Sequence, residues 1–181
     1  MAVYKSFIKR AVNNALSQFM LRDIYLLKED VSERAISHKV AEYLQNEFGS
    51  FYSVDCEYNR NFILQGRSKV IHVLDDEIRE LVKNKSSIEI INDLAYRELS
   101  VYPDIIVHKR GKPNNLLVVE VKKSSNQVGN KLDSLKLAAY TDPSEANNLH
   151  YEYGLFIKFD MTSYTNHELS WFKEGKQVEK I

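Results

Sequence analysis

Residues 102–123 decide the fold: they read Tyr-Pro-Asp-Ile-Ile-Val-His, then Lys-Arg-Gly-Lys-Pro-Asn-Asn, then Leu-Leu-Val-Val-Glu-Val-Lys-Lys. Both apolar arms are rich in β-branched residues, which favour strands. The polar segment 109–115 between them contains the glycine, proline and asparagine residues that are typical of turns. The pattern therefore predicts two antiparallel strands joined by a short loop.

Strand side chains alternate between two faces, so the register of this hairpin decides which of its polar groups meet. If the hairpin closes symmetrically about Lys112, Asp104 faces Glu120 and His108 faces Leu116. Directly opposed residues have Cβ atoms about 5 Å apart. The sequence thus predicts two adjacent carboxylates on one face of an apolar hairpin.

Two carboxylates this close are costly in apolar surroundings unless a cation lies near them. Lys122 is two residues beyond Glu120 and therefore lies on the same face. A hard divalent cation such as Mg²⁺ prefers oxygen ligands and suits such a pair. The alternative is a simple ion pair between Glu120 and a nearby lysine at the edge of a sheet.

Pro103-Asp104, followed after fifteen residues by Glu120-Val121-Lys122, resembles the signature of the PD-(D/E)xK nuclease superfamily, which includes restriction endonucleases and Holliday-junction resolvases. The resemblance implies a restriction-endonuclease-like α/β fold, with a central mixed β-sheet flanked by α-helices. It also implies that Asp104, Glu120 and the Val121 carbonyl hold Mg²⁺, with Mn²⁺ as a substitute. Lys122 would then position or activate the attacking water.

A helix is predicted from Asp30 to Phe48, and Glu33 extends its inward stripe of Ile36 and Val40. An acidic residue in line with a buried face has two explanations. One is a capping box, with Asp30 as N-cap and Glu33 as the third helical residue. The other is a third carboxylate directed at the metal site.

The resemblance favours the second explanation. Residues 33–38 and 41–44 are similar to a group of small stand-alone bacterial proteins within the superfamily, and the similarity extends over about residues 30–160. It implies that Glu33 is a catalytic residue and a further metal ligand.

Composition places the chain among ordinary globular proteins: 181 residues, 44% hydrophobic and 28% charged, which predicts one domain. The single cysteine, Cys56, excludes an internal disulfide and predicts a buried thiol in a reducing cytoplasm. We expect no membrane span and no signal peptide. The formal net charge is zero, but residues 108–136 hold seven basic and two acidic residues, a local charge of about +5.

Three basic residues are candidates for nucleic-acid contact. Arg60 follows a strand predicted over residues 51–58 and could grip a phosphate with two hydrogen bonds, or be an ordinary surface arginine. Lys123 belongs to the basic segment. Lys136 could meet the nucleic-acid backbone, or could pair with Asp133 one turn away on the surface of a helix.

Outside this centre, residues 1–29 are predicted as a helical extension, broken near residues 22–23, that caps the core or forms a homodimer contact. Residues 66–100 are predicted as an insertion. Within it, residues 75–82 form a short helix and residues 86–95 either a strand or a helix.

After the hairpin, a polar loop over 124–129 lies at the mouth of the predicted site. A helix over 130–140, with Leu132, Leu135 and Ala139 inward, precedes a core strand over 151–159 and a short edge strand over 168–172.

These patterns predict Mg²⁺-dependent hydrolysis of phosphodiester bonds in nucleic acid, more readily DNA than RNA. The five histidines have no ligand-like spacing, and no glycine-rich phosphate loop is present, so a zinc site and nucleotide hydrolysis are not expected. The alternative is a non-catalytic nucleic-acid-binding or scaffolding module that retains the nuclease fold. The neutral overall charge favours that alternative.

Overall fold

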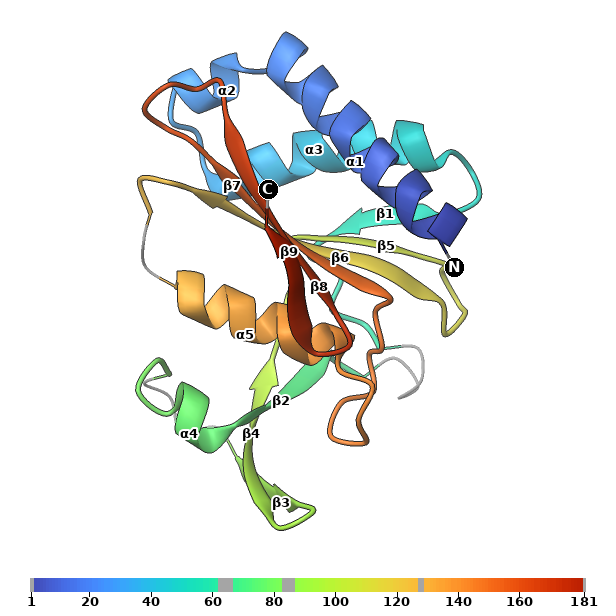
Figure 1. Ribbon diagram of the computed structural model, residues 1–181, viewed down its shortest axis with the longest axis vertical. Coiled ribbons are helices and arrows are strands. Elements are labelled where there is room, and N and C mark those ends of the chain that lie inside the picture. Colours follow the sequence, from blue (N-terminus) through green and yellow to red (C-terminus); the bar gives the residue numbers. More distant parts are fainter. Residues whose placement is uncertain (1, 62–66, 83–86, 127–128, 181) are drawn as a thin grey trace.

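Two β-sheets and the helices around them make up the described part of the chain (Figure 1). The structure is a computed structural model, which describes residues 2–61, 67–82, 87–126 and 129–180. In chain order the elements are α1 (Ala2–Arg22), α2 (Tyr25–Lys28), α3 (Glu33–Phe48), β1 (Ser53–Cys56), β2 (Val70–Leu74), α4 (Asp75–Ile78), β3 (Ile88–Ile91), β4 (Leu94–Ser100), β5 (Ile105–His108), β6 (Asn115–Lys123), α5 (Asn130–Thr141), β7 (Tyr153–Phe159), β8 (His167–Lys173) and β9 (Lys176–Lys180).

The larger sheet has six strands in the order β1-β5-β6-β7-β8-β9. Only the β6–β7 pair is parallel, and the other neighbours in this sheet are antiparallel. A parallel pair needs a long crossover connection, and α5 provides it. The chain therefore has the predicted mixed sheet, and the α/β class is confirmed.

Helices cover both faces of this sheet, with α1 and α3 on one side and α5 on the other (Figure 1). Strand β5 shows the consequence. Ile105 and Val107 belong to the core beneath α1 and α3, whereas Ile106 belongs to the core beneath α5. Because both faces are covered, Ile105, Ile106 and Val107 are all apolar, without the polar alternation of a half-exposed strand.

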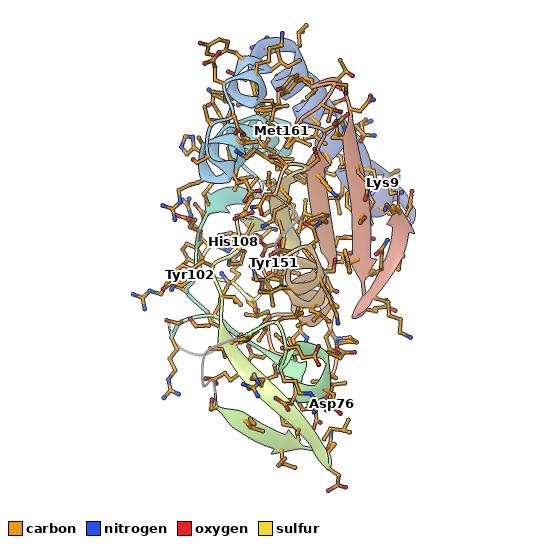
Figure 2. All side chains as sticks on the ribbon, turned by 90° about the vertical axis from the view of Figure 1, so that its left-hand side faces the viewer. Lys9, Asp76, Tyr102, His108, Tyr151 and Met161 are labelled. Atoms are coloured by element: carbon orange, nitrogen blue, oxygen red, sulfur yellow. The ribbon has the colours of Figure 1, made fainter. Side chains whose placement is uncertain are left out.

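Residues 67–82 and 87–100 form a separate small sheet, in the order β2-β4-β3, together with α4. Of the two alternatives for residues 86–95, the strand is correct for the described residues 87–95. Asn92 and Asp93 adopt positive φ angles of 49° and 63° at the turn between β3 and β4. Figure 2 shows this part at the end of the molecule that carries Asp76, with Tyr151 in the middle.

The N-terminal helix is part of the core. Val12, Ala15 and Phe19 are fully buried, and α1 packs along α3. The predicted break is confirmed, because α1 ends at Arg22 and α2 begins at Tyr25. The core-capping role is thus present, while a homodimer through α1 stays a prediction. Among the helices that the structure describes, none is both long enough and apolar enough to cross a membrane.

Three predicted strands have different limits. The strand expected over 51–58 is reduced to β1, and the strand expected from residue 151 begins at Tyr153. The segment expected to be an edge strand is β8, which is covered by β9. The prediction missed β9 because its Lys-Gln-Val-Glu-Lys sequence has little apolar character. Its pairing depends on a tight turn at Glu174 and Gly175, where φ is 52° and 74°.

Candidate metal centre

The hairpin of β5 and β6 has the predicted register at the end that carries the carboxylates. Ile105 pairs with Val119 and Ile106 with Val118, and the next step places Asp104 opposite Glu120. The opposite end is different, because a bulge after Val107 shifts the pairing.

His108 therefore faces Asn115, and the prediction that it faces Leu116 is wrong. Leu116 is the extra residue in β6, and its side chain joins the core beneath α1 and α3. One added residue changes the face that a side chain occupies.

Glu120 is buried, and Asp104 is half-buried. The Asp104 carboxylate accepts a hydrogen bond of 2.8 Å from the Val121 backbone N–H. In an antiparallel strand the N–H and C=O of one residue point to the same side, so the Val121 carbonyl also leaves β6 toward Asp104. Glu120 is 4% exposed, and the Tyr140 hydroxyl donates to it at 3.3 Å.

Acidic and basic side chains alternate through the site. The Lys136 Nζ lies 3.7 Å from Glu120 and 3.0 Å from Asp133. The Lys122 Nζ lies 3.2 Å from Asp133 and 3.7 Å from Glu33. We call these five residues, together with Asp104, the carboxylate cluster. The ion pairs thus run without a break from Glu120 through Lys136, Asp133 and Lys122 to Glu33. Asp104 is the fourth carboxylate and lies beside this chain of ion pairs.

Glu33 reaches the cluster from the first turn of α3. The N-cap is Ser32, whose hydroxyl accepts a hydrogen bond of 3.3 Å from the Ala35 N–H. The predicted capping box, with Asp30 as N-cap, is therefore wrong. The Glu33 carboxylate instead accepts a hydrogen bond of 3.0 Å from the backbone N–H of Lys123, at the end of β6. The structure thus joins α3 to the predicted site through Glu33.

Asp133 and Lys136 were expected on the surface, and this expectation is wrong. They do pair, but Asp133 is 7% exposed and Lys136 points into the cluster. The inward face of α5 follows Asp133, Leu137 and Tyr140, at spacings of four and three. That spacing is the same signal that singled out Glu33, so it could have identified Asp133. Lys136 thus compensates buried charge, and its expected contact with a nucleic-acid backbone is not supported.

Burial and mutual repulsion disturb the titration of both hairpin carboxyls. Loss of water contact raises the pKa of Glu120 to about 8; the Lys136 ammonium opposes this rise, while Asp104 and Asp133 add to it. Burial raises the pKa of Asp104 to about 6, although the hydrogen bond from the Val121 N–H acts to lower this pKa. Both groups are therefore costly to ionise, and a cation would relieve that cost.

Replacing Glu120 with glutamine should remove a pH dependence of stability in EDTA. A folded-state pKa raised from 4.5 to about 8 means that the folded form retains a proton that the unfolded chain releases. The free energy of unfolding of the wild type should therefore fall as pH rises from about 5 to 8, by an amount on the order of 3 kcal/mol. Urea unfolding curves across this range measure it.

Glu120→Gln should be less sensitive to pH and more stable than the wild type at pH 8. Glu168→Gln is a matched control, because Glu168 is a partly exposed glutamate of β8 that pairs with Lys180 of the edge strand β9. Equal stability of the wild type at pH 5 and pH 8 would contradict the assignment of a raised pKa to Glu120.

Two further basic residues that were expected to contact nucleic acid have other positions. The Lys123 ammonium bonds to the Asp30 carboxylate at 2.7 Å and the Val31 carbonyl at 2.9 Å, so it anchors the segment before α3. Arg60 forms a β-bridge with Ser68 and lines a different cavity. Neither side chain belongs to the carboxylate cluster, and contact of either with nucleic acid stays a prediction.

The loop after β6 borders the cluster, as predicted. The Asn126 amide donates to Glu33 at 3.3 Å. Gly129 has a φ of 91°, and a Cβ atom there would lie 3.8 Å from both the Asp133 carboxylate and the Lys122 Nζ. Residues 127–128 lie outside the described residues.

The predicted thiol is half-buried, and burial raises the pKa of Cys56 to about 11, which fits a structural role.

The donor atoms of the carboxylate cluster suit a hard cation. Carboxylate oxygens and the Val121 carbonyl are the kinds of ligand that Mg²⁺ and Mn²⁺ prefer.

A second group of possible metal ligands lies in the small sheet, where ligand atoms of His72, Glu89 and Glu98 are within 4.8 Å of one another. It is the one group of three within this distance among the described residues. In the carboxylate cluster, lysine ammonium groups separate the acids.

Comparisons of the chain with protein-family models, with curated proteins and with solved structures found no match. The arrangement of the cluster's own side chains must therefore carry the functional argument.

Proposed function

We propose that the protein is a Mg²⁺-dependent nuclease of the PD-(D/E)xK superfamily, with a restriction-endonuclease-like fold, acting on nucleic acid in the cytoplasm. The observation that carries this proposal is the convergence of Glu33, Asp104, Glu120 and Lys122 on one end of β6. These residues come from three separate segments of the chain. DNA is the proposed substrate, and hydrolysis of its phosphodiester bonds is the proposed reaction.

Asp104, Glu120 and the Val121 carbonyl would hold the ion, with Glu33 close by. Mg²⁺ is commonly bound through one or two carboxylates and retains several waters, so this set is sufficient. When bound, the ion lowers the pKa of a water molecule and neutralises charge on the phosphate.

The lysines of the cluster have separate tasks. Lys122 is held between Asp133 and Glu33, at 3.2 and 3.7 Å, so its ammonium has a fixed position within the carboxylate cluster. A preorganised cation there orients the attacking water or stabilises the negative charge that develops on the phosphate. Lys136 balances the buried charge of Glu120 and Asp133.

A second candidate is a non-catalytic nucleic-acid-binding or scaffolding module with the same fold. The observation that favours it is the pairing of Glu33, Glu120 and Asp133 with lysines inside the protein. Such a network can satisfy buried charges without a metal ion. The formal net charge of zero also argues against broad electrostatic attraction to DNA.

A cleavage assay separates the two candidates. End-labelled and circular substrates of single-stranded, double-stranded and branched DNA, and of RNA, are incubated with purified protein in Mg²⁺, Mn²⁺ or EDTA. The nuclease proposal expects products with either metal ion, none in EDTA, and none with Glu120→Gln. A protein that binds both metal and DNA but cuts none of these substrates would favour the binding module.

A further inference from the structure

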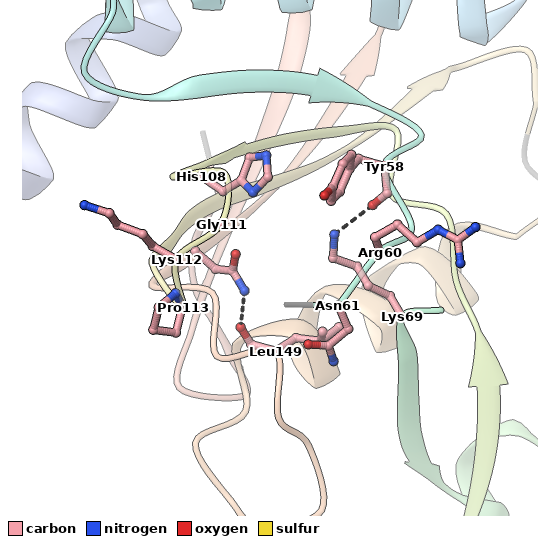
Figure 3. A pocket seen from close by; sticks show the side chains of 10 residues that line it. Tyr58, Arg60, Asn61, Lys69, His108, Gly111, Lys112, Pro113 and Leu149 are labelled. Carbon is pink, nitrogen blue, oxygen red and sulfur yellow. Dashed lines mark hydrogen bonds between the residues drawn. The ribbon is translucent and has the colours of Figure 1, made fainter. Parts of the chain in front are cut away.

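A second site is formed by a cavity at the other end of β5, beside the turn between β5 and β6. Its volume is about 150 Å³, and Tyr58, Lys69, His108 and Asn115 contribute to its walls (Figure 3). Arg60 and Lys112 also line the cavity, and Figure 3 shows their charged ends extending outward. The lining thus carries three basic residues and no carboxylate.

The unusual member of this lining is Lys69, which is 2% exposed. Its ammonium donates one hydrogen bond of 2.7 Å to the Tyr58 carbonyl and lies 4.5 Å from the centroid of the Tyr58 ring. An ammonium group has three donors, and buried lysines almost always have an anionic partner. Burial lowers the pKa of Lys69 to about 8, which is the expected cost of a buried cation.

The protein does not supply that partner within the described ranges, where no carboxylate lies within 4.0 Å of the Lys69 ammonium. The neighbouring residues 62–66 contain no acidic residue in the sequence. Asp55 influences the pKa of Lys69 but is engaged elsewhere. It bonds to the His108 ring at 2.8 Å and to the Arg110 Nε at 2.9 Å.

The size of the cavity limits the ligand. Pockets for ordinary small molecules measure about 300–1,000 Å³. A cavity of about 150 Å³ has room for one phosphate group, but not for the two sugars that flank a phosphate inside a strand. This volume therefore favours a free anion or a phosphate at the end of a chain.

Strand β5 relates this cavity to the carboxylate cluster. His108 and Asp104 lie four residues apart on one face, which corresponds to about 13 Å along a strand. We propose that the cavity binds the terminal phosphate of a nucleic-acid strand, with the Lys69 ammonium as its buried cationic partner. This inference rests on the proposed nuclease function for the identity of the ligand, since free phosphate offers the same chemistry.

The first test measures phosphate binding in EDTA, where cleavage does not take part. The melting temperature is compared in 20 mM inorganic phosphate and in NaCl of equal ionic strength. A specific anion site should raise it by a few degrees in the wild type, because a ligand that binds only the folded state stabilises that state. The rise should disappear in Lys69→Met and persist in Lys173→Met, which removes a lysine of β8 that pairs with Glu174 and does not line the cavity.

A second measurement needs no variant, in case Lys69→Met does not fold. In a phosphate titration of the wild type followed by NMR, the amide resonances of Gly111, Lys112 and His108 should move more than those of β8 and β9. Equal effects of phosphate and chloride, or shifts spread over the surface, would overturn the site.

The third test identifies the source of the phosphate. Short oligonucleotides with a 5′-phosphate, a 3′-phosphate or hydroxyl ends are titrated in EDTA. One phosphorylated end should bind about tenfold more tightly than the hydroxyl form, which is the effect of one charge-assisted hydrogen bond. Lys69→Met should lose this preference. Binding of free phosphate without any preference for a phosphorylated end would overturn the strand-end proposal. A preserved preference without cleavage would refute the nuclease and not the cavity.

Discussion

Replacing Lys122 with alanine is expected to lower the rate of DNA cleavage by about 100-fold or more. The Lys122 ammonium lies within 4 Å of Asp133 and Glu33, in the cluster where the proposed hydrolysis would develop negative charge on the phosphate. Removing one preorganised electrostatic group from such a position commonly costs two to three decades in rate. Single-turnover kinetics at saturating protein and Mg²⁺ measure the effect directly.

Affinity for DNA should change far less, by about threefold, because one contact among several is a small part of binding. Lys173→Ala is the matched control: it removes the same charge from the end of β8, outside the carboxylate cluster, and should cleave at the wild-type rate. Equal losses of affinity and rate in Lys122→Ala would show that the lysine only attracts DNA. Unchanged cleavage would remove Lys122 from the catalytic proposal.

Asp104→Asn is expected to abolish stabilisation of the protein by Mg²⁺ or Mn²⁺. A ligand present at 100 times its dissociation constant stabilises the folded state by about 2.7 kcal/mol. In a chain of this size that corresponds to a rise of about 5–10 °C in melting temperature. The wild type should show such a rise over EDTA, and Asp104→Asn should show almost none, since an amide is a poor substitute for a charged ligand.

The same variant also tests whether Asp104 has a structural role. Burial and the neighbouring acids Asp133 and Glu33 raise the pKa of Asp104 to about 6, so its charge is unfavourable in the metal-free protein. Asp104→Asn should therefore be at least as stable as the wild type in EDTA, because the amide oxygen can still accept the Val121 hydrogen bond. A loss of several kcal/mol would mean that Asp104 holds the fold together and would count against a metal-binding role.

Local sequence patterns predicted the part of the site that depends on alternation along one hairpin. Asp104, Glu120 and Lys122 share a face because strand geometry has a period of two, and a turn rich in glycine, proline and asparagine sets the register. Glu33 could be identified in the same way, from its place in line with the buried stripe of α3.

The contacts that depend on packing between elements could not be predicted from such patterns. Lys123 reads as an exposed basic residue, but the segment before α3 surrounds its ammonium. Lys136 looks like a surface lysine of α5, and only the packing of α5 against β6 places its ammonium beside Glu120. His108 is buried and bonds to Asp55 of β1, a partner 53 residues away that no spacing within the hairpin indicates.

The cavity around Lys69 shows the same limit. Its walls come from residues 58–61, from Lys69, from residues 108–115 and from Leu149, so separate parts of the sequence meet there. No spacing within one segment indicates that these pieces meet. A lysine that begins a strand is ordinary in a sequence, and only its burial in the folded chain identifies it as unusual.

The most direct test of the central claim, that the carboxylate cluster is a metal site, is anomalous diffraction from crystals soaked in Mn²⁺. We predict one strong peak about 2.2 Å from oxygens of Asp104 and Glu120, near the Val121 carbonyl, with Lys136 displaced from Glu120. A peak only at His72, Glu89 and Glu98, or a cluster that keeps its lysine pairs with no bound ion, would contradict the claim.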